Sequence, residues 1–153
     1  MNDASFLKKG FTISTDKDLL DFNMIYNYLG KESYWSKGIA AERVRTSIDN
    51  SMCFGVYDNG KQVGFARVIT DKAIFAYLCD VFVLKSHRGL SLSKWLLQTI
   101  RSHPELQGLK RWMLATNDAH GLYKQFGFGP LTNPEKWMDI YAPFKTDQGE
   151  NGK

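Results

Sequence analysis

The hydrophobic pattern of the chain alternates between the periods of strands and helices. Residues 52–57 and 62–70 are apolar runs separated by Asp58-Asn59-Gly60-Lys61, and Asn-Gly between two such runs predicts a β-hairpin. Residues 75–84 are rich in β-branched and aromatic side chains, which predicts another strand. Further strands are predicted over residues 11–13, 110–116 and 137–141.

Helices are predicted between these strands. The clearest has Leu92, Trp95, Leu96 and Ile100 at i, i+3, i+4 and i+8, which is the spacing of one helix face. His103-Pro104 ends it. The others are expected over residues 40–49, over residues 119–126 with Gly127 as the stop, and over a segment that begins at Asp16 or Asp18 and ends at Gly30.

The order of these elements predicts an α/β fold with a mixed sheet and helices on both faces. A chain of 153 residues, with 43% hydrophobic and 24% charged residues, suits one globular domain. We assign this domain to residues 1–144. Residues 145–153 are polar and contain glycine, so we expect a flexible C-terminal tail.

Composition narrows the range of functions. The net charge of +4 is scattered along the chain, which argues against a nucleic-acid-binding protein. Cys53 and Cys79 have neither CxxC nor histidine spacing, so we expect two free thiols in a reducing compartment and no metal site. No apolar run is long enough for a signal peptide or a membrane span, which predicts a cytoplasmic protein without a membrane partner.

The segment with the most chemical information joins the strand over residues 75–84 to the clearest helix. A helix N-terminus presents unpaired backbone N–H groups and the positive end of the helix dipole. Ser91 and Ser93 are small and carry hydroxyl donors, while Lys85, Arg88 and Lys94 add positive charge. This combination suits a pyrophosphate group. The alternative is an ordinary turn with a capped helix start.

Two motifs in this sequence resemble those of a known family. Arg88-Gly89-Leu90-Ser91-Leu92-Ser93 is similar to the [Q/R]-x-x-G-x-[G/A] pyrophosphate loop of the GNAT superfamily of acyl-CoA N-acyltransferases. Ala119-His120-Gly121-Leu122-Tyr123-Lys124-Gln125-Phe126-Gly127-Phe128 resembles its A-x-x-L-Y-x-x-x-G-F segment. The motifs occur in the family's order, and the resemblance covers roughly residues 11–141.

The resemblance implies a GNAT fold with a mostly antiparallel sheet, and an N-acetyltransferase with acetyl-CoA as co-substrate. A primary amine would attack the thioester directly in a ternary complex, with no metal. Tyr123 would protonate the departing sulfur, since a phenol with a pKa near 10 can act as a general acid. Backbone groups of Phe82, Val83 and Leu84 would pair with the pantetheine and polarise the thioester carbonyl. The pyrophosphate would lie against Arg88, Gly89, Leu90, Ser91, Leu92, Ser93 and Lys94.

The sequence also departs from the family pattern. Ser91 and Ser93 stand where glycine or alanine is usual, and serine adopts a positive φ less readily than glycine. Cys79 occupies the place of a frequent acidic residue. Asp80 is adjacent, but its side chain would point to the other face of a regular strand and would reach the site only through a bulge. Asp80 could therefore act as a general base, or it could be a member of a structural ion pair. Thr116 replaces an asparagine that is frequent in relatives.

The acceptor cannot be read from these motifs. Tyr34 and Trp35 lie in the linker that borders the acceptor site in this fold, where they could hold a cationic amine of a small molecule or a protein. A non-catalytic acyl-CoA-binding module with the same fold is the alternative function. Residues 137–141, as an exposed edge strand, could support a homodimer.

Overall fold

The structure, a computed structural model, describes residues 3–144. Its centre is a five-stranded sheet in the order β1-β2-β3-β4-β5. The predicted tail over residues 145–153 lies outside the described residues, and the domain extent of residues 1–144 stays a prediction. The strands are β1 (Phe11–Ser14), β2 (Met52–Asp58), β3 (Lys61–Thr70), β4 (Phe75–Val83) and β5 (Arg111–Met113), and the α-helices are α1 (Asp3–Lys8), α2 (Phe22–Asn27), α3 (Ala41–Asp49), α4 (Leu92–Ser102) and α5 (His120–Lys124).

The sheet is mixed and contains the predicted hairpin. β1 to β4 pair antiparallel with their neighbours, and β5 joins β4 in parallel. The β2–β3 hairpin turns at Asn59 and Gly60, whose φ values of 49° and 89° both lie in the left-handed region that a type I′ turn requires. The predicted mixed, mostly antiparallel sheet is confirmed.

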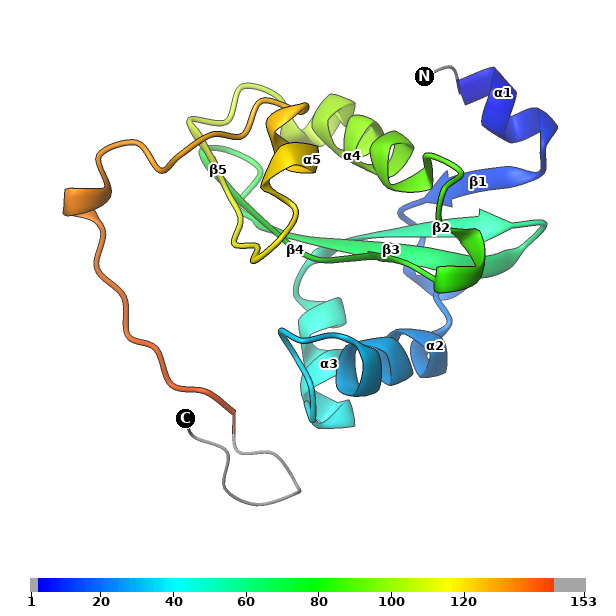
Figure 1. Cartoon of the computed structure of the whole chain (residues 1–153), viewed down its shortest axis with the longest axis horizontal. Coiled ribbons are helices and arrows are strands. Elements are labelled where there is room, and N and C mark those ends of the chain that lie inside the picture. Colours follow the sequence, from blue (N-terminus) through cyan, green and yellow to red (C-terminus); the bar gives the residue numbers. More distant parts are fainter. Residues whose placement is uncertain (1–2, 145–153) are drawn as a thin grey trace.

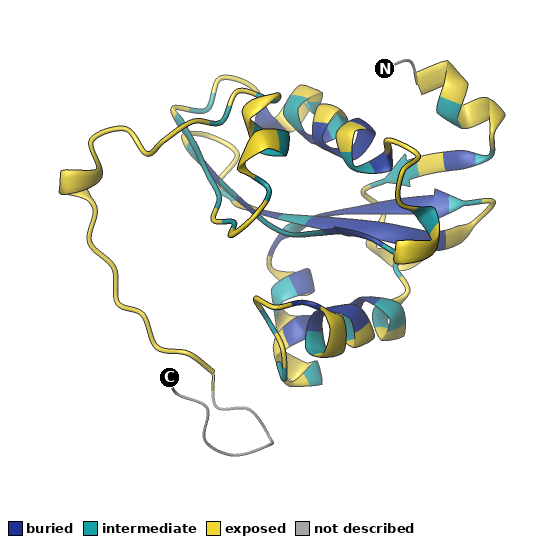
Figure 2. Ribbon diagram, viewed as in Figure 1, coloured by how far each residue is buried: buried dark blue, intermediate teal, exposed yellow. Residues whose placement is uncertain are grey.

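Helices cover both faces of the sheet, as predicted. In Figure 1, α4 and α5 lie on one face, and α2 and α3 lie on the other. Because strand side chains alternate between faces, the sheet contributes to two apolar layers. Figure 2 shows the buried residues concentrated in the central strands and in the helix faces turned toward them. The α4 layer includes Phe54, Val56, Ala66, Leu78, Val83, Trp95 and Leu96, and the α2/α3 layer includes Ile25, Leu29, Val44, Phe65 and Phe82.

The first predicted helix is wrong in its bounds. Asp16 caps only a 3₁₀ turn (Lys17–Leu19), and Asp21 caps α2 by accepting a hydrogen bond of 3.1 Å from the Met24 N–H. Gly30 does not end the helix, because a π-helical turn (Tyr28–Glu32) continues through it. Leu19 is exposed, so the buried face begins one turn later than the apolar pattern indicates.

The predicted last strand over residues 137–141 is also wrong. These residues pair with no strand within the described chain, and in Figure 1 they leave the body of the molecule as an extended segment. Their composition suits a strand, but a strand also needs an edge on which to pair.

Both cysteines are free thiols, as predicted. Cys53 on β2 and Cys79 on β4 are each register partners of Arg67 on β3. Two strand spacings separate their backbones by about 9–10 Å, too far for a disulfide. In residues 3–144 there is also no helix whose length and apolarity would suffice to cross a membrane.

Candidate functional site

The candidate site is built on the divergence of β4 and β5. β5 pairs with β4 only from Phe75 to Tyr77, whereas β4 continues to Val83. Past Tyr77, the edge of β4 that faces β5 therefore has no strand partner among the described residues. Such an edge offers backbone N–H and C=O groups to an extended ligand.

Strand alternation decides which backbone groups face this opening. The Leu84 N–H donates a 2.9 Å hydrogen bond to the Val63 carbonyl, so Leu84 is turned toward β3. The carbonyl oxygen of Phe82 also faces β3, lying 3.1 Å from where a Cβ on Gly64 would stand. Val83 lies between them and therefore directs its N–H away from β3, into the opening. Of the three residues expected to pair with pantetheine, Val83 has the orientation that this pairing needs.

The loop after β4 leads into the N-terminus of α4 at the end of this opening. The first intrahelical hydrogen bond runs from the Trp95 N–H to the Ser91 carbonyl over 3.1 Å. The N–H groups of Leu92, Ser93 and Lys94 precede this bond, so helix geometry directs them out of the helix end. Together with the helix dipole they form a site for an anion.

Two residues of the loop have left-handed backbone conformations. Gly89 has φ 82°, and Ser91, the N-cap of α4, has φ 64° and ψ 19°. Glycine takes this conformation without a steric cost, whereas serine does not. The side chain of Ser91 makes no capping hydrogen bond to α4, so its hydroxyl is not committed to the helix. Ser91 therefore adopts the left-handed conformation of the loop at a conformational cost. Its hydroxyl is available for a hydrogen bond to a ligand.

Arg88 is held at the entrance of the opening by two hydrogen bonds. Its Nε donates to the Val83 carbonyl at 3.2 Å, and its Nη2 donates to the Tyr28 hydroxyl at 3.1 Å. Tyr28 is stacked on Phe82, with ring centroids 3.8 Å apart. The guanidinium charge is thus fixed at the end of β4, in the loop that leads to α4, where it can add to the attraction for a phosphate.

Asp80 occupies a β-bulge in β4. On β3, Phe65 pairs with Phe82 and Arg67 pairs with Cys79, so β4 has one residue more than β3 between these pairs. Asp80 has φ 54°, a left-handed conformation that aspartate tolerates better than most residues. The bulge moves its side chain to the α2/α3 face, which regular alternation from Cys79 would not allow. A role for Asp80 in the site depends on this bulge, and the structure contains it.

The Asp80 carboxylate has a donor on each oxygen. Arg67 Nε donates to Oδ2 at 2.9 Å, and Trp35 Nε1 donates to Oδ1 at 2.8 Å. Both members of the Arg67–Asp80 ion pair are largely buried. Asp80 is therefore an oriented anion, and each oxygen keeps a further lone pair that can accept a proton or a hydrogen bond. Cys79 beside it offers no alternative base, since burial raises the pKa of its thiol to about 12.

Tyr123 lies on α5, on the opposite face of the sheet. It is half-buried and packs edge-on against Phe128, with centroids 6.0 Å apart. Burial, and secondarily the neighbouring Tyr34 phenol and Asp118 carboxylate, raise the pKa of Tyr123 to about 12. The phenol is therefore protonated at neutral pH, as a proton donor must be.

The linker after α2 connects the two sides of the site. The Tyr34 hydroxyl accepts a 3.0 Å hydrogen bond from the Asn117 N–H in the loop between β5 and α5. Trp35, whose indole binds Asp80, packs edge-on against Tyr34 at 5.1 Å. The linker thus crosses from the bulge of β4 to the segment that carries Tyr123. The expected substrate-binding pair and both expected catalytic residues border one region.

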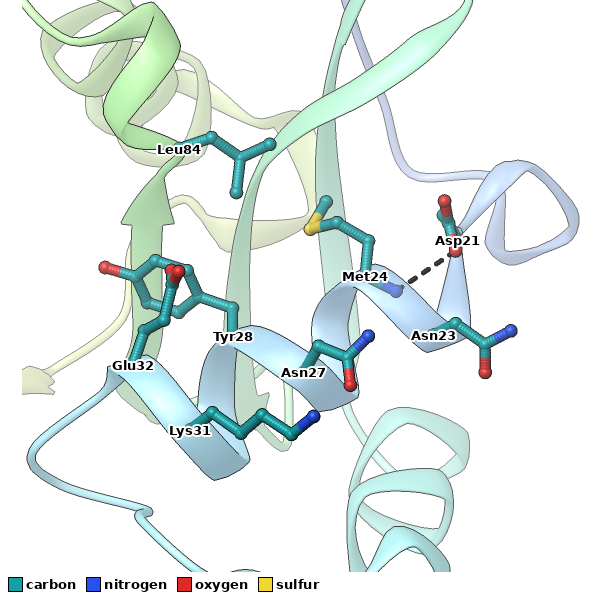
Figure 3. Close-up of a pocket in the computed structure, with 8 residues that line it drawn as sticks. All are labelled: Asp21, Asn23, Met24, Asn27, Tyr28, Lys31, Glu32 and Leu84. Atoms are coloured by element: carbon teal, nitrogen blue, oxygen red, sulfur yellow. Dashed lines mark hydrogen bonds between the residues drawn. The ribbon is translucent and has the colours of Figure 1, made fainter.

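An open groove of about 630 Å³ adjoins this region on the α2 side. Figure 3 shows it between α2 with its π-helical turn and Leu84, with Asp21 and Asn23 at one end and Tyr28 and Glu32 at the other. Tyr28 connects the groove to the rest of the site, because its hydroxyl meets Arg88 and its ring lies 6.4 Å from that of Trp35. Polar and apolar surfaces contribute about equally to the lining, which has two carboxylates, one lysine and two asparagines: Asp21, Asn23, Met24, Asn27, Tyr28, Lys31, Glu32 and Leu84.

Comparison with known proteins identifies the family. The model of the acetyltransferase (GNAT) family matches residues 22–128, which contain both the opening and the loop. A protein of Gibberella zeae that is assigned as an acetyltransferase is 32% identical, over 74% of this chain and 75% of its own length. The chain belongs to the GNAT acetyltransferase family.

Solved structures agree with this assignment. A Xanthomonas campestris pv. campestris protein assigned to the GNAT acetyltransferases is 50% identical, with a TM-score of 0.85 over 87% of this chain and 94% of that one. The ribosomal-protein-S18-alanine N-acetyltransferase of Escherichia coli shares the fold at 22% identity, with a TM-score of 0.65 over 80% of this chain and 79% of its own. The expected GNAT fold is confirmed.

Sequence reasoning missed two members of the site in this GNAT chain. Arg67 is a charged residue inside the apolar run of β3, and such a residue needs a buried partner, so it could have been matched with Asp80. The family motif draws attention to Thr116, whereas the contact with Tyr34 comes from the next residue, Asn117. Because its backbone N–H, not its side chain, makes this contact, no residue type signals it.

Proposed function

We propose that this GNAT chain is an N-acetyltransferase that transfers an acetyl group from acetyl-CoA to a primary amine by direct attack in a ternary complex. The observation that carries the proposal is the opening between β4 and β5. The Val83 N–H is directed into this opening, and the N-terminus of α4 follows the loop after β4. The Asp80 carboxylate on β4 and the protonated Tyr123 on α5 are linked through Trp35 and Tyr34, which supports a shared role for them.

Acetyl-CoA fits the donors on this side of the sheet. The Arg88 guanidinium and the N–H groups at the start of α4 can bind the pyrophosphate. The Val83 N–H can pair with the pantetheine as a neighbouring strand would, while a nearby β4 N–H polarises the thioester carbonyl. Gly89 leaves open space where a Cβ would stand, so the loop can approach a phosphate closely.

The acetyl transfer itself needs one proton acceptor and one proton donor. The amine nitrogen forms a bond to the thioester carbon, and the carbon–sulfur bond breaks. Asp80 accepts the proton that the amine loses, and Tyr123 gives a proton to the departing sulfur. Proton exchange with solvent then restores both groups. Arg67 and Trp35 hold the carboxylate in place, so they are positioning residues.

The acceptor amine approaches from the α2/α3 face in this proposal. Asp80, Trp35 and the groove that Tyr28 lines lie on that face. The carboxylates of Asp21 and Glu32 can attract the positive charge of an amine, and the exposed ring of Trp35 can contact it by a cation–π interaction. The two carboxylates thus favour a cationic amine, which can belong to a small molecule or to a protein.

The test combines calorimetric titration of acetyl-CoA with an assay of free thiol in the presence of a panel of amines. We expect micromolar binding and amine-dependent thiol release, which Tyr123→Phe lowers about 10²- to 10⁴-fold without weakening acetyl-CoA binding. Tyr26→Phe on α2 is the matched control and should leave the rate unchanged. Absence of acetyl-CoA binding would refute the proposal. Binding without thiol release from any amine would favour the non-catalytic acyl-CoA-binding module.

A further inference from the structure

Helix α5, which carries Tyr123, is too short to hold its own geometry. It has five residues, His120–Lys124, and within the described chain none of them is fully buried. Isolated helices shorter than about 12–15 residues are marginal in water, so most of their stability in a protein comes from contacts with other elements. The N-cap, Ala119, makes no side-chain hydrogen bond to the helix. The position of the Tyr123 phenol therefore depends on what holds this segment from outside.

The turn after α5 binds the backbone of Tyr123. The Tyr123 carbonyl accepts hydrogen bonds from the Phe126 N–H at 2.9 Å and from the Phe128 N–H at 3.3 Å. Gly127 lies between these two donors and has φ 95°, a left-handed conformation that commonly ends a helix. A contact that fixes this turn therefore also fixes the end of α5 at the residue with the proposed proton donor.

Arg101, in the last turn of α4, makes such a contact. Its Nε donates a 3.3 Å hydrogen bond to the Phe126 carbonyl, and its Nη2 lies 3.8 Å from where a Cβ on Gly127 would stand. Its guanidinium also lies over the Trp112 ring of β5, 5.0 Å from the ring centroid, where a cation–π interaction is favourable. Because α4 and α5 lie on the same face of the sheet (Figure 1), one side chain joins α4, β5 and the turn after α5.

A series of aromatic contacts leads from Trp112 to the Tyr123 ring. Trp112 packs edge-on against Phe128, with ring centroids 6.3 Å apart, and Phe128 packs edge-on against Tyr123 at 6.0 Å. Edge-to-face pairs favour particular ring orientations, so each ring restricts the next. Arg101 is therefore connected to Tyr123 in two ways. One connection reaches the Tyr123 backbone through Phe126, and the other reaches its ring through Phe128.

We propose that Arg101 is a positioning residue for the phenol of Tyr123, a role that rests on the proposed acetyl transfer. Tyr34 holds the segment before α5 through the Asn117 N–H, and Arg101 holds the segment after it. Loss of the Arg101 contacts would let the phenol move away from the departing sulfur, and proton transfer requires the two groups within hydrogen-bond reach. Arg101 acts through Tyr123 and does not touch the reacting atoms, because its guanidinium is engaged by Phe126 and Trp112.

Kinetics of Arg101→Gln test this role. We expect kcat to fall about 10-fold or more, because a misplacement of about 1 Å can cost about 100-fold in rate. The acetyl-CoA dissociation constant, measured by calorimetry, should stay unchanged. In Tyr123→Phe no phenol remains to be positioned, so adding Arg101→Gln should lower kcat less than about 2-fold. The same loss in both backgrounds would indicate a merely structural role and would overturn the proposal. Arg43→Gln is the matched control, since Arg43 on α3 also lies over an aromatic ring, that of Phe144 at 5.1 Å.

Amide hydrogen exchange tests the anchor without any readout of acetyl transfer. In Arg101→Gln the amides of residues 119–128 should exchange about 10-fold faster than in the wild type, while those of α2 and α3 stay unchanged. Arg101→Lys keeps a cation but lacks the rigid guanidinium fork, so it should shift kcat and exchange in the same direction by less. It also replaces Arg101→Gln if that variant does not fold. Unchanged exchange over residues 119–128 would overturn the proposal.

Failure of this inference and failure of the proposed function give different results. If Tyr123→Phe keeps the wild-type kcat while acetyl-CoA still binds, the proposed proton donor is wrong, and so is a positioning role for Arg101. If Tyr123→Phe is slow but Arg101→Gln keeps the wild-type kcat, only the role of Arg101 is wrong.

Discussion

The indole N–H of Trp35 donates a 2.8 Å hydrogen bond to Asp80, which lies 45 positions further along the chain. Trp35 belongs to the linker after α2, and Asp80 belongs to the bulge of β4. Arg67 holds the other carboxylate oxygen, so the orientation of Asp80 is set from two sides. Because Tyr34 in the same linker contacts Asn117, the bulge that carries Asp80 is connected through this linker to the segment leading to Tyr123.

The first prediction concerns the charge of Asp80. In Asp80→Asn, the introduced asparagine tolerates a positive φ, and its amide oxygen can still accept the Trp35 hydrogen bond. The loss of the anion should lower kcat/KM for the amine about 100-fold or more, with the acetyl-CoA dissociation constant unchanged. Thiol-release kinetics and calorimetry measure the two quantities. Asp18→Asn, at an exposed position, is the control. An unchanged kcat/KM would show that Asp80 is not the proton acceptor and has only a structural role in its ion pair with Arg67.

A second prediction concerns the pH dependence of the rate. The pKa of Tyr123 is raised to about 12, mainly by burial. A raised pKa means that the phenol stays protonated above its usual range, so the proton donor should not be lost between about pH 8 and 10. The rate at saturating acetyl-CoA and amine should therefore show no fall over this interval. A fall with an apparent pKa of about 9–10 in the wild type, absent in Tyr123→Phe, would contradict this protonation state.

The local pattern of hydrophobic positions and turn residues was sufficient to predict most of the fold. The Asn59-Gly60 turn and the spacing of Leu92 and Trp95 depend on neighbours in sequence, and both elements were predicted correctly. From the sequence we could say only that Asp80 needs a bulge to reach the site. Whether the bulge forms depends on the register between β3 and β4, which the local pattern does not give. Contacts such as Tyr34 with Asn117, 83 positions apart, depend on how the whole chain folds. Residues 137–141 have strand composition, but composition does not tell which edge, if any, they meet.

The third prediction concerns the two serines that replace glycine or alanine in the family motif. Ser91 has φ 64° and makes no capping hydrogen bond to α4, so Ser91→Gly should relieve strain and raise the free energy of unfolding by about 0.5–1 kcal/mol. Ser93 lies inside the first turn of α4, where Ser93→Gly should lower it by about 0.5 kcal/mol. Urea denaturation of both variants measures the two changes. A decrease in the free energy of unfolding for Ser91→Gly would show that the backbone of Ser91 is not strained.

The last prediction concerns Tyr57, which is buried on β2. Its ring lies against Gly55, where any Cβ would collide with the hydroxyl, and that hydroxyl has no hydrogen-bond partner among the described residues. Tyr57→Phe removes an unpaired polar group and should raise the free energy of unfolding by about 1 kcal/mol at about pH 8. Tyr141→Phe, at an exposed tyrosine, is the control and should change nothing.

The same substitution should alter alkaline stability. Burial, then the charges of Asp16 and Cys53, raise the pKa of Tyr57 to about 12. The unfolded chain loses this phenolic proton at about pH 10, whereas the folded chain retains it, so the free energy of unfolding of the wild type should fall as pH rises from about 10 to 12. Urea denaturation at several pH values should show a shallower fall for Tyr57→Phe, since Tyr77 and Tyr123 then remain as the tyrosines with a raised pKa. Parallel curves for wild type and variant would mean that Tyr57 ionises in the folded chain as easily as in the unfolded one.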